Sequence, residues 1–132
     1  MNIQGYLMDT NIAIAMLAKE EAVLEFVRQA KEDKMPLFFS VITECEVFSG
    51  MESEYQLHSI KLFNSRRCID VNSRIARSAG DIRREQKAKG RKLKTPDAII
   101  IATATDHQLG LVSRDADMAF VQKEYGVPLF TL

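Results

Sequence analysis

The chain has 132 residues, of which 46% are hydrophobic and 27% charged, a composition typical of an ordinary soluble globular protein. This length fits a single domain, residues 1–132, with a core that needs no disulfides. The formal net charge is zero, with 18 basic and 18 acidic residues, so an evenly charged surface that attracts nucleic acid is excluded.

The cysteines and the apolar runs of the sequence indicate the cellular compartment in which we expect the protein. Cys45 and Cys68 are isolated and lack metal-ligand spacing, so we expect two buried thiols in a reducing compartment. The apolar run at residues 12–18 lacks a basic leader and is far too short to cross a bilayer. We therefore expect a cytoplasmic protein that makes no contact with a membrane.

The elements expected from the sequence alternate between strands and helices. Apolar runs at residues 5–8 and 36–39 predict two strands, separated by a helix whose apolar stripe includes Val23, Phe26 and Val27. A third strand is expected at 68–71, followed by a helix with Ile75 and Ile82 on one face and by an apolar helix over 98–104. Runs at 109–112 and 127–130 complete five strands.

Each strand is a continuous apolar run, which is typical of strands buried on both faces of a parallel sheet. Alternation of such strands with helices favours an α/β fold. The sequence therefore predicts a three-layer sandwich with a central, mostly parallel five-stranded sheet.

Acidic residues occur at four corresponding places in this pattern. Asp9 ends the first strand, Glu46 lies in the helix after the second, Asp97 opens the apolar helix and Asp115 follows the fourth strand. In α/β sheets the functional crevice lies beyond the carboxyl ends of the strands, where helices begin. We therefore expect all four side chains to point into one crevice.

Each acid taken alone also has a structural interpretation. Asp9 and Asp115 could cap helices, Thr43 and Glu46 have capping-box spacing, and Asp97 could complement a helix dipole. Four carboxylates in one crevice would instead repel one another unless a cation neutralised them. Because oxygen ligands favour Mg²⁺ or Mn²⁺, which activate water and stabilise phosphate charge, the four acids together predict a metal-dependent catalytic site.

A basic run immediately precedes Asp97. Residues 83–94 hold seven Lys or Arg and one Glu, a local charge of +6 within a neutral chain. Such a run could guide a phosphodiester backbone to the acids, or could simply be a solvated helix end and loop. The candidate RNA-binding residues are Arg83, Arg84, Arg91, Lys92 and Lys94.

Four motifs follow one another along the chain: MDTN at 8–11, SVITECEVFSG at 40–50, PDAIIIATA at 96–104 and LVSRD at 111–115. In this order and at these spacings they resemble the PIN-domain ribonuclease family, and in size the VapC-type toxins of toxin–antitoxin pairs. The resemblance covers residues 7–120. It implies a PIN-like fold and a ribonuclease that depends on Mg²⁺ or Mn²⁺.

The resemblance assigns a role to single residues. The first and third family acids fall on Asp9 and Asp97, and the second falls on Glu46, not on neighbouring Glu44. Thr10, Asn11 and Ser113 match positions that support the metal site. At the fourth position Ser113 replaces the usual Thr, Asp115 fits the acid that follows, and Asp117 is the alternative ligand.

The resemblance also implies partners. Members of the PIN-domain ribonuclease family are often homodimers, act on RNA and are inhibited by a small antitoxin that covers the acidic pocket. The function that we predict is a Mg²⁺- or Mn²⁺-dependent endoribonuclease, the toxin of a type II toxin–antitoxin pair.

Of three other functions, one stays open, one is disfavoured and one is excluded. The altered fourth position suggests a catalytically impaired PIN-like module that binds RNA or a partner. A phosphohydrolase with Asp9 as nucleophile is disfavoured because Asn11 stands where that chemistry needs a second Asp. A P-loop NTPase is excluded because Gly-x-x-x-x-Gly-Lys-Ser/Thr does not occur.

Overall fold

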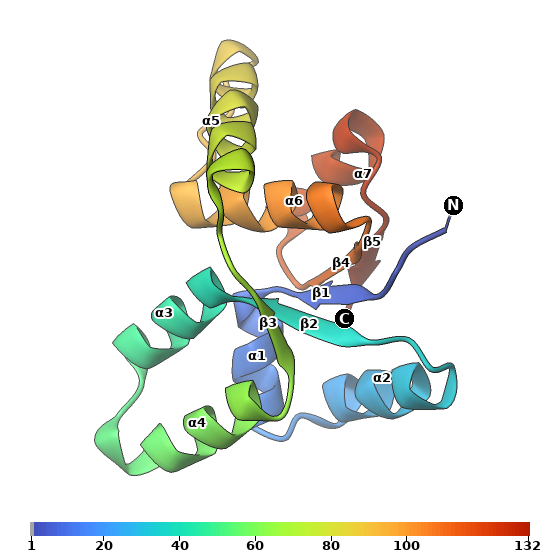
Figure 1. Cartoon of the computed structure of the whole chain (residues 1–132), viewed down its shortest axis with the longest axis vertical. Helices are drawn as coiled ribbons and strands as arrows, with labels where there is room; N and C mark the ends of the chain where they lie inside the picture. The colour runs from blue at the N-terminus through green and yellow to red at the C-terminus, as the bar shows by residue number, and fades with distance from the viewer. Residues whose placement is uncertain (1) are drawn as a thin grey trace.

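Residues 2–132 are described by the computed structural model, in which one central sheet is covered on both faces by helices (Figure 1). In chain order the elements are β1 (Tyr6–Met8), α1 (Thr10–Leu17), α2 (Glu21–Glu32), β2 (Leu37–Ser40), α3 (Val41–Gly50), the 3₁₀ turn η1 (Ser53–Tyr55), α4 (Gln56–Asn64), β3 (Arg67–Ile69), α5 (Ser73–Ala88), α6 (Thr95–His107), β4 (Gly110–Ser113), the 3₁₀ turn η2 (Ala116–Met118), α7 (Phe120–Tyr125) and β5 (Leu129–Thr131).

The five strands lie in the order β3-β2-β1-β4-β5, and every pair in the described residues is parallel. In the registers, Leu7 of the central strand lies opposite Phe38 on one side and Leu111 on the other. The chain moves outward from β1 to β3 and then returns to place β4 on the other side of β1. This reversal creates a topological switch point between β1 and β4, the place where ligands bind in such sheets.

Alternate side chains of the strands point to two separate cores, because successive residues of a strand face opposite sides of the sheet. Leu7 and Leu111 pack with the helices α5, α6 and α7, whereas Met8 and Val112 pack with α1, α2, α3 and α4. The two groups of helices lie on opposite sides of the sheet in Figure 1. The expected α/β three-layer sandwich is confirmed, with a sheet that is entirely parallel.

The strand bounds differ from the expected ones by one or two residues, and Ser113 becomes the last residue of β4.

The expectation of two buried thiols was wrong for Cys45, which is exposed, while Cys68 is half-buried. Cys45 lies in α3 two residues from both Thr43 and Val47, which are buried, and two residues in a helix turn a side chain to the opposite face. Among the helices of residues 2–132, none combines the length and hydropathy that a membrane span requires.

Candidate active site

Asp9 is the most buried acid of the site, with 5% of its surface exposed. It follows β1 and caps α1, and its Oδ1 accepts a hydrogen bond of 2.8 Å from the Thr10 backbone N–H. Its Oδ2 accepts one of 2.7 Å from the Ser113 hydroxyl. Burial raises the pKa of Asp9, these two hydrogen bonds oppose the rise, and the charges of Glu46 and Asp115 add to it.

Glu46 extends from α3 toward Thr10, the residue next to Asp9. Its Oε1 accepts a hydrogen bond of 2.6 Å from the Thr10 hydroxyl, which also lies 3.2 Å from the hydroxyl of buried Thr43. The capping-box interpretation of Thr43 and Glu46 is wrong, because Ser40 caps α3 by accepting from the Ile42 backbone N–H. Glu46 is therefore free of a capping role.

The neighbouring acid in α3 points elsewhere. Glu44 Oε1 accepts a contact of 3.4 Å from the Cys68 thiol, which belongs to β3 at the edge of the sheet. Two residues along a helix face different directions, so only one of the pair can reach the crevice. The geometry agrees with the assignment of Glu46 in place of Glu44.

The fourth corner is organised by Ser113, which is 1% exposed at the end of β4. Its hydroxyl accepts hydrogen bonds from the Asp115 backbone N–H at 3.0 Å and from the Asn11 amide at 3.4 Å. The Asp115 carboxylate caps η2 by accepting from the Asp117 backbone N–H at 2.9 Å. Asp115 lies near enough to Asp9 and Asp97 for its charge to raise the pKa of both, whereas Asp117 is exposed.

Asp97 completes the group from the first turn of α6. The pKa of its carboxyl is raised to about 6, mainly by burial and in addition by the charges of Asp9, Asp115 and Glu46, while the charge of Lys94 opposes the rise. The three acids influence Asp97 because they lie near it across the switch point. The structure thus brings together, from four separate segments, the carboxylates of Asp9, Glu46, Asp97 and Asp115.

The basic residues divide into two groups. Lys94 precedes α6 and lies close enough to Asp97 to lower the pKa of that carboxyl. The others line a groove beside the end of α5, and most have a protein partner. Arg83 Nε donates to the Leu93 carbonyl at 3.0 Å, and Arg84 forms an ion pair of 3.0 Å with Asp81.

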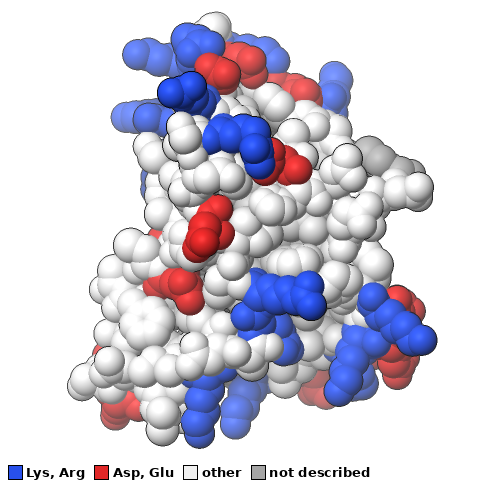
Figure 2. Space-filling view, in the orientation of Figure 1, with Lys and Arg blue, Asp and Glu red and all other residues white. Residues whose placement is uncertain are grey.

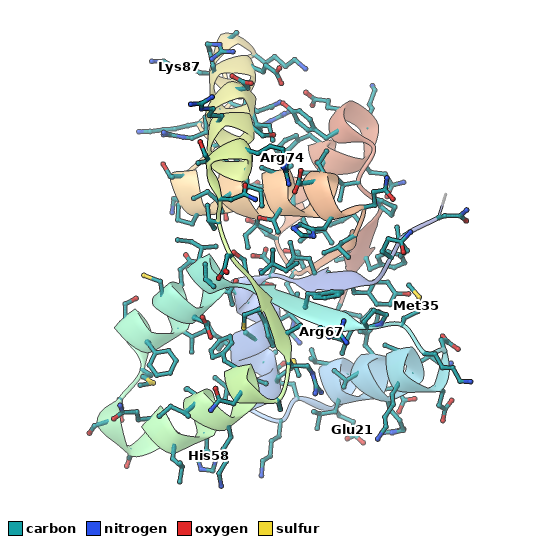
Figure 3. All side chains as sticks on the ribbon, in the orientation of Figure 1. Glu21, Met35, His58, Arg67, Arg74 and Lys87 are labelled. Carbon is teal, nitrogen blue, oxygen red and sulfur yellow. The ribbon has the colours of Figure 1, made fainter. Side chains whose placement is uncertain are left out.

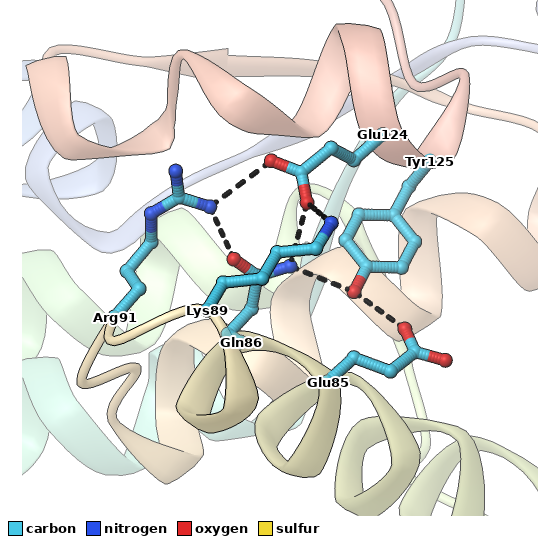
Figure 4. Close-up of polar contacts among 6 residues, drawn as sticks. All are labelled: Glu85, Gln86, Lys89, Arg91, Glu124 and Tyr125. Atoms are coloured by element: carbon cyan, nitrogen blue, oxygen red, sulfur yellow. Dashed lines mark hydrogen bonds and ion pairs between the residues drawn. The ribbon is translucent and has the colours of Figure 1, made fainter.

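Arg91 is held by a network that the sequence did not suggest (Figure 4). Its guanidinium donates to the side chain of Gln86 and pairs with Glu124 at 3.0 Å. Gln86 is fully buried and donates to Glu124 at 3.0 Å and to the Tyr125 hydroxyl at 2.9 Å. The one signal in the sequence was a glutamine four residues after Ile82, on the apolar face of α5.

A family model described as PIN domain matches residues 6–124 of the chain. The chain belongs to the PIN-domain family. This PIN domain is 30% identical over 107 residues to "Ribonuclease VapC10" of Mycobacterium tuberculosis (strain CDC 1551 / Oshkosh), covering 81% of this chain and 80% of the relative. The resemblance to the PIN-domain and VapC-type proteins is therefore confirmed.

Solved structures share the fold. A toxin–antitoxin complex from Klebsiella pneumoniae contains a chain that matches with a TM-score of 0.70 and 33% identity, covering 87% of this PIN domain and 91% of that chain. A DNA-bound VapBC structure from Salmonella typhimurium matches with a TM-score of 0.80 and 21% identity, covering 98% of each chain.

The oxygen donors of this PIN domain fit a hard divalent cation. The cluster offers carboxylates only, from residues held on rigid elements, which is the donor chemistry that Mg²⁺ and Mn²⁺ prefer. As they stand, no three His, Cys, Asp or Glu side chains of residues 2–132 are arranged to hold one ion. Asp9, Glu46 and Asp115 accept hydrogen bonds from Thr10, Ser113 and the Asp117 N–H, and a carboxylate oxygen that accepts one hydrogen bond keeps a lone pair for a cation.

Proposed function

We propose that this chain is a Mg²⁺- or Mn²⁺-dependent endoribonuclease and the toxin of a type II toxin–antitoxin pair. The observation that carries the proposal is the convergence of Asp9, Glu46, Asp97 and Asp115 at the switch point of the sheet. Membership of the PIN-domain family and the 30% identity to a protein named ribonuclease support RNA as the substrate. The whole chain, residues 1–132, would act as one nuclease domain.

The four carboxylates would hold the cation, and the surrounding hydroxyls would orient them. When bound, a divalent ion would activate water and stabilise negative charge as an RNA phosphodiester is hydrolysed. Ser113 and the Thr10 N–H hold both oxygens of Asp9, while the Thr10 hydroxyl holds Glu46. Asn11 donates to Ser113 and accepts from the Arg114 N–H, which ties α1 to the end of β4.

The cleavage experiment compares the parent chain with Asp97→Asn on total cellular RNA, with Mg²⁺ or Mn²⁺ present and with chelator. We expect site-specific cuts with metal, none with chelator, and a rate for Asp97→Asn lower by on the order of a hundredfold or more, because a charge that holds the ion is lost. Asp70→Asn, which neutralises an exposed Asp beside the edge strand β3, is the matched control and should keep the parent rate.

Equal cleavage rates for the parent and a folded Asp97→Asn chain would contradict the assignment of Asp97 to the active site.

Asp115→Asn and Asp117→Asn, measured side by side in the same cleavage assay, test which residue is the fourth acid. The structure favours a large loss for Asp115→Asn and little for Asp117→Asn, since Asp115 acts on Asp9 and Asp97 and Asp117 is exposed.

The second candidate is a catalytically impaired module that binds RNA or a partner. It was suggested by the altered fourth position, where Ser113 replaces the usual Thr and Asp117 lies three residues before Phe120 instead of next to it. The Ser113 hydroxyl nevertheless makes the hydrogen bond to Asp9 that a Thr hydroxyl could make, and Asp115 acts on Asp9 and Asp97. The ribonuclease is therefore favoured. RNA that is retained in a salt-dependent way, without any cut over a long incubation, would support the impaired module instead.

We further propose two assemblies, with a small antitoxin and with a second copy of the chain. The antitoxin is supported by the solved neighbours, which are described as toxin–antitoxin and VapBC complexes. A cellular RNA substrate would place the protein in the cytoplasm, which cell fractionation would test. An anchored, membrane-bound fraction would contradict this location.

A further inference from the structure

A groove of about 680 Å³ lies beside the outer half of α5, apart from the acid cluster. It is lined by Gly80, Arg83, Arg84, Lys87, Gly90, Arg91, Lys92 and Leu93. Five of these residues are basic and none is acidic. Figure 2 shows that Lys and Arg gather over this end of the molecule, and Figure 3 places Lys87 at the outer end of α5.

The five cations of the groove are not equally available to a ligand. Arg84 is paired with Asp81, and Arg91 is paired with Glu124 and packs over the Phe120 ring at 4.3 Å. Within residues 2–132, Lys87 and Lys92 form no ion pair.

Arg83 is the third cation of the groove that forms no ion pair within residues 2–132. Its Nε donates to the Leu93 carbonyl, and the other guanidinium nitrogens form no ion pair with these residues. Three unmatched positive charges therefore face one groove, which creates a local potential that attracts anions.

The walls of the groove are fixed before any ligand arrives. The bond from Arg83 to Leu93 joins α5 to the loop, and the Arg91 backbone N–H donates to the Gln86 carbonyl at 2.8 Å. The Gln86 network then ties the same loop to α7 (Figure 4). A preformed site loses less conformational entropy when it binds a ligand, so these bonds favour binding.

The loop that forms one wall leads directly to the acid cluster. Leu93 lines the groove, Lys94 follows it, and Asp97 stands three residues later in the first turn of α6. A ligand with negative charges at regular intervals could therefore lie along the groove and continue past Lys94 to the carboxylates. An acidic peptide has no reason to extend into a cluster of acids, whereas an RNA backbone does so if its phosphodiester is the substrate.

We propose that this groove binds phosphates of the RNA strand that flank the phosphodiester to be cut, with Arg83, Lys87 and Lys92 as the contacts. The proposal rests on the proposed function. It adds Lys87 to the expected RNA-binding residues, and it gives Arg91 the role of holding the loop. The groove then sets affinity for longer RNA and takes no part in the chemical step.

The test compares Lys87→Gln/Lys92→Gln with the control Lys31→Gln/Lys61→Gln, which removes two exposed charges from α2 and α4. Binding of a labelled single-stranded RNA is measured over a range of salt, with all chains also carrying Asp97→Asn to prevent cutting. We expect the groove variant to bind roughly tenfold more weakly and its salt slope to fall by about 1.4, the value for two phosphate contacts, while the control is unchanged.

Cleavage by chains with Asp97 intact gives a second measurement. The groove variant should have a higher KM for long RNA at an unchanged kcat, because the contacts bind substrate and transition state equally. A trinucleotide too short to reach the groove should be cut equally by the groove and control variants.

The outcomes separate the two proposals. If no chain cuts RNA but the groove variant alone loses binding, the groove stands and the ribonuclease fails. If cutting is normal and both double variants bind RNA alike, the groove proposal is overturned and the ribonuclease stands. Binding of poly-glutamate at the groove, with no effect on RNA, would overturn it in favour of an acidic protein.

Discussion

At the scale of single residues, the Ser113 hydroxyl joins three parts of the site. It donates to Asp9 at 2.7 Å and accepts from Asn11 and from the Asp115 N–H. A hydroxyl has one proton to donate and two lone pairs, so every bonding position of Ser113 is used. With 1% of its surface exposed, Ser113 fixes the distance between the acids that follow β1 and β4.

Asp97 makes stability depend on pH. Its folded pKa of about 6 lies above the ordinary value of 3.8, so the folded chain binds a proton more tightly than the unfolded chain. The contribution of Asp97 to the free energy of unfolding therefore falls as pH rises from about 4 to about 6. Asp97→Asn removes this loss and should be more stable than the parent at pH 7, by on the order of 1 kcal/mol after solvent screening.

Thermal melting between pH 4.5 and 7.5 in chelator measures this effect, read as the difference in Tm between the two chains. Mg²⁺ added at pH 7 should raise the Tm of the parent and leave Asp97→Asn nearly unchanged, because only the folded parent binds the ion well. Parallel pH curves for the two chains would contradict the assigned pKa.

At the scale of elements, α5 has a polar residue on its buried face. Ile75, Ala79, Ile82 and Gln86 recur at helical spacing and all are buried. Gln86 is stable there because its amide donates to Glu124 and Tyr125 and its carbonyl accepts from Arg91 (Figure 4). The end of α5 is thus joined to α7 by hydrogen bonds of a buried amide, in addition to the apolar packing of Ile75, Ala79 and Ile82.

Gln86→Leu should lower the free energy of unfolding by about 1–3 kcal/mol, because it keeps the volume but removes the partner of three polar groups. The matched change Lys89→Gln breaks only the exposed ion pair with Glu124 and should cost less than about 1 kcal/mol. Urea unfolding at neutral pH compares the two variants. If Lys89→Gln lowered the free energy of unfolding as much as Gln86→Leu, the buried hydrogen bonds of Gln86 would contribute no more to stability than the exposed ion pair.

At the scale of the whole molecule, an apolar surface lies on the opposite side of the sheet from the basic groove. Its large exposed side chains come from α1, α3, η1 and α4 and are Ile14, Phe48, Tyr55, Leu57 and Ile60. The helices α1, α3 and α4 pack against one another on this side of the sheet (Figure 1). Exposed apolar side chains on neighbouring helices are typical of interaction sites, and we predict that the proposed antitoxin binds here.

Light scattering tests both assemblies. The chain alone should have twice the mass of one copy, and addition of the antitoxin should increase that mass. Leu57→Asp/Ile60→Asp should abolish the increase and leave the homodimer intact, because charge is costly in an apolar interface. His58→Asp on the same helix is the control, and antitoxin binding by the double variant equal to that of the control would contradict the assignment.

Local pattern was enough to predict much of the fold. Five continuous apolar runs predicted five parallel strands, although the edge strands β3 and β5 are only partly buried. Asp9, Asp97 and Asp115 were singled out because each stands near a strand end or a helix start, whereas Glu46 was chosen over Glu44 through the family resemblance. Cys45 shows where local pattern fails: a small residue in an apolar stretch can still lie on the exposed face of its helix. The sequence did not single out Lys87 as a groove residue, because a basic run does not reveal which of its charges share a groove.

The amino-acid sequence by itself determined the elements, their parallel character and the acids at their ends, because these depend on the residue period and on local backbone preference. Only the tertiary structure decided that β1 lies between β2 and β4, that Asp115 lies near enough to Asp97 to raise its pKa, and that Gln86 joins α5 to α7. These features depend on contacts between residues far apart in the chain, and which residues meet is determined by how the whole molecule packs.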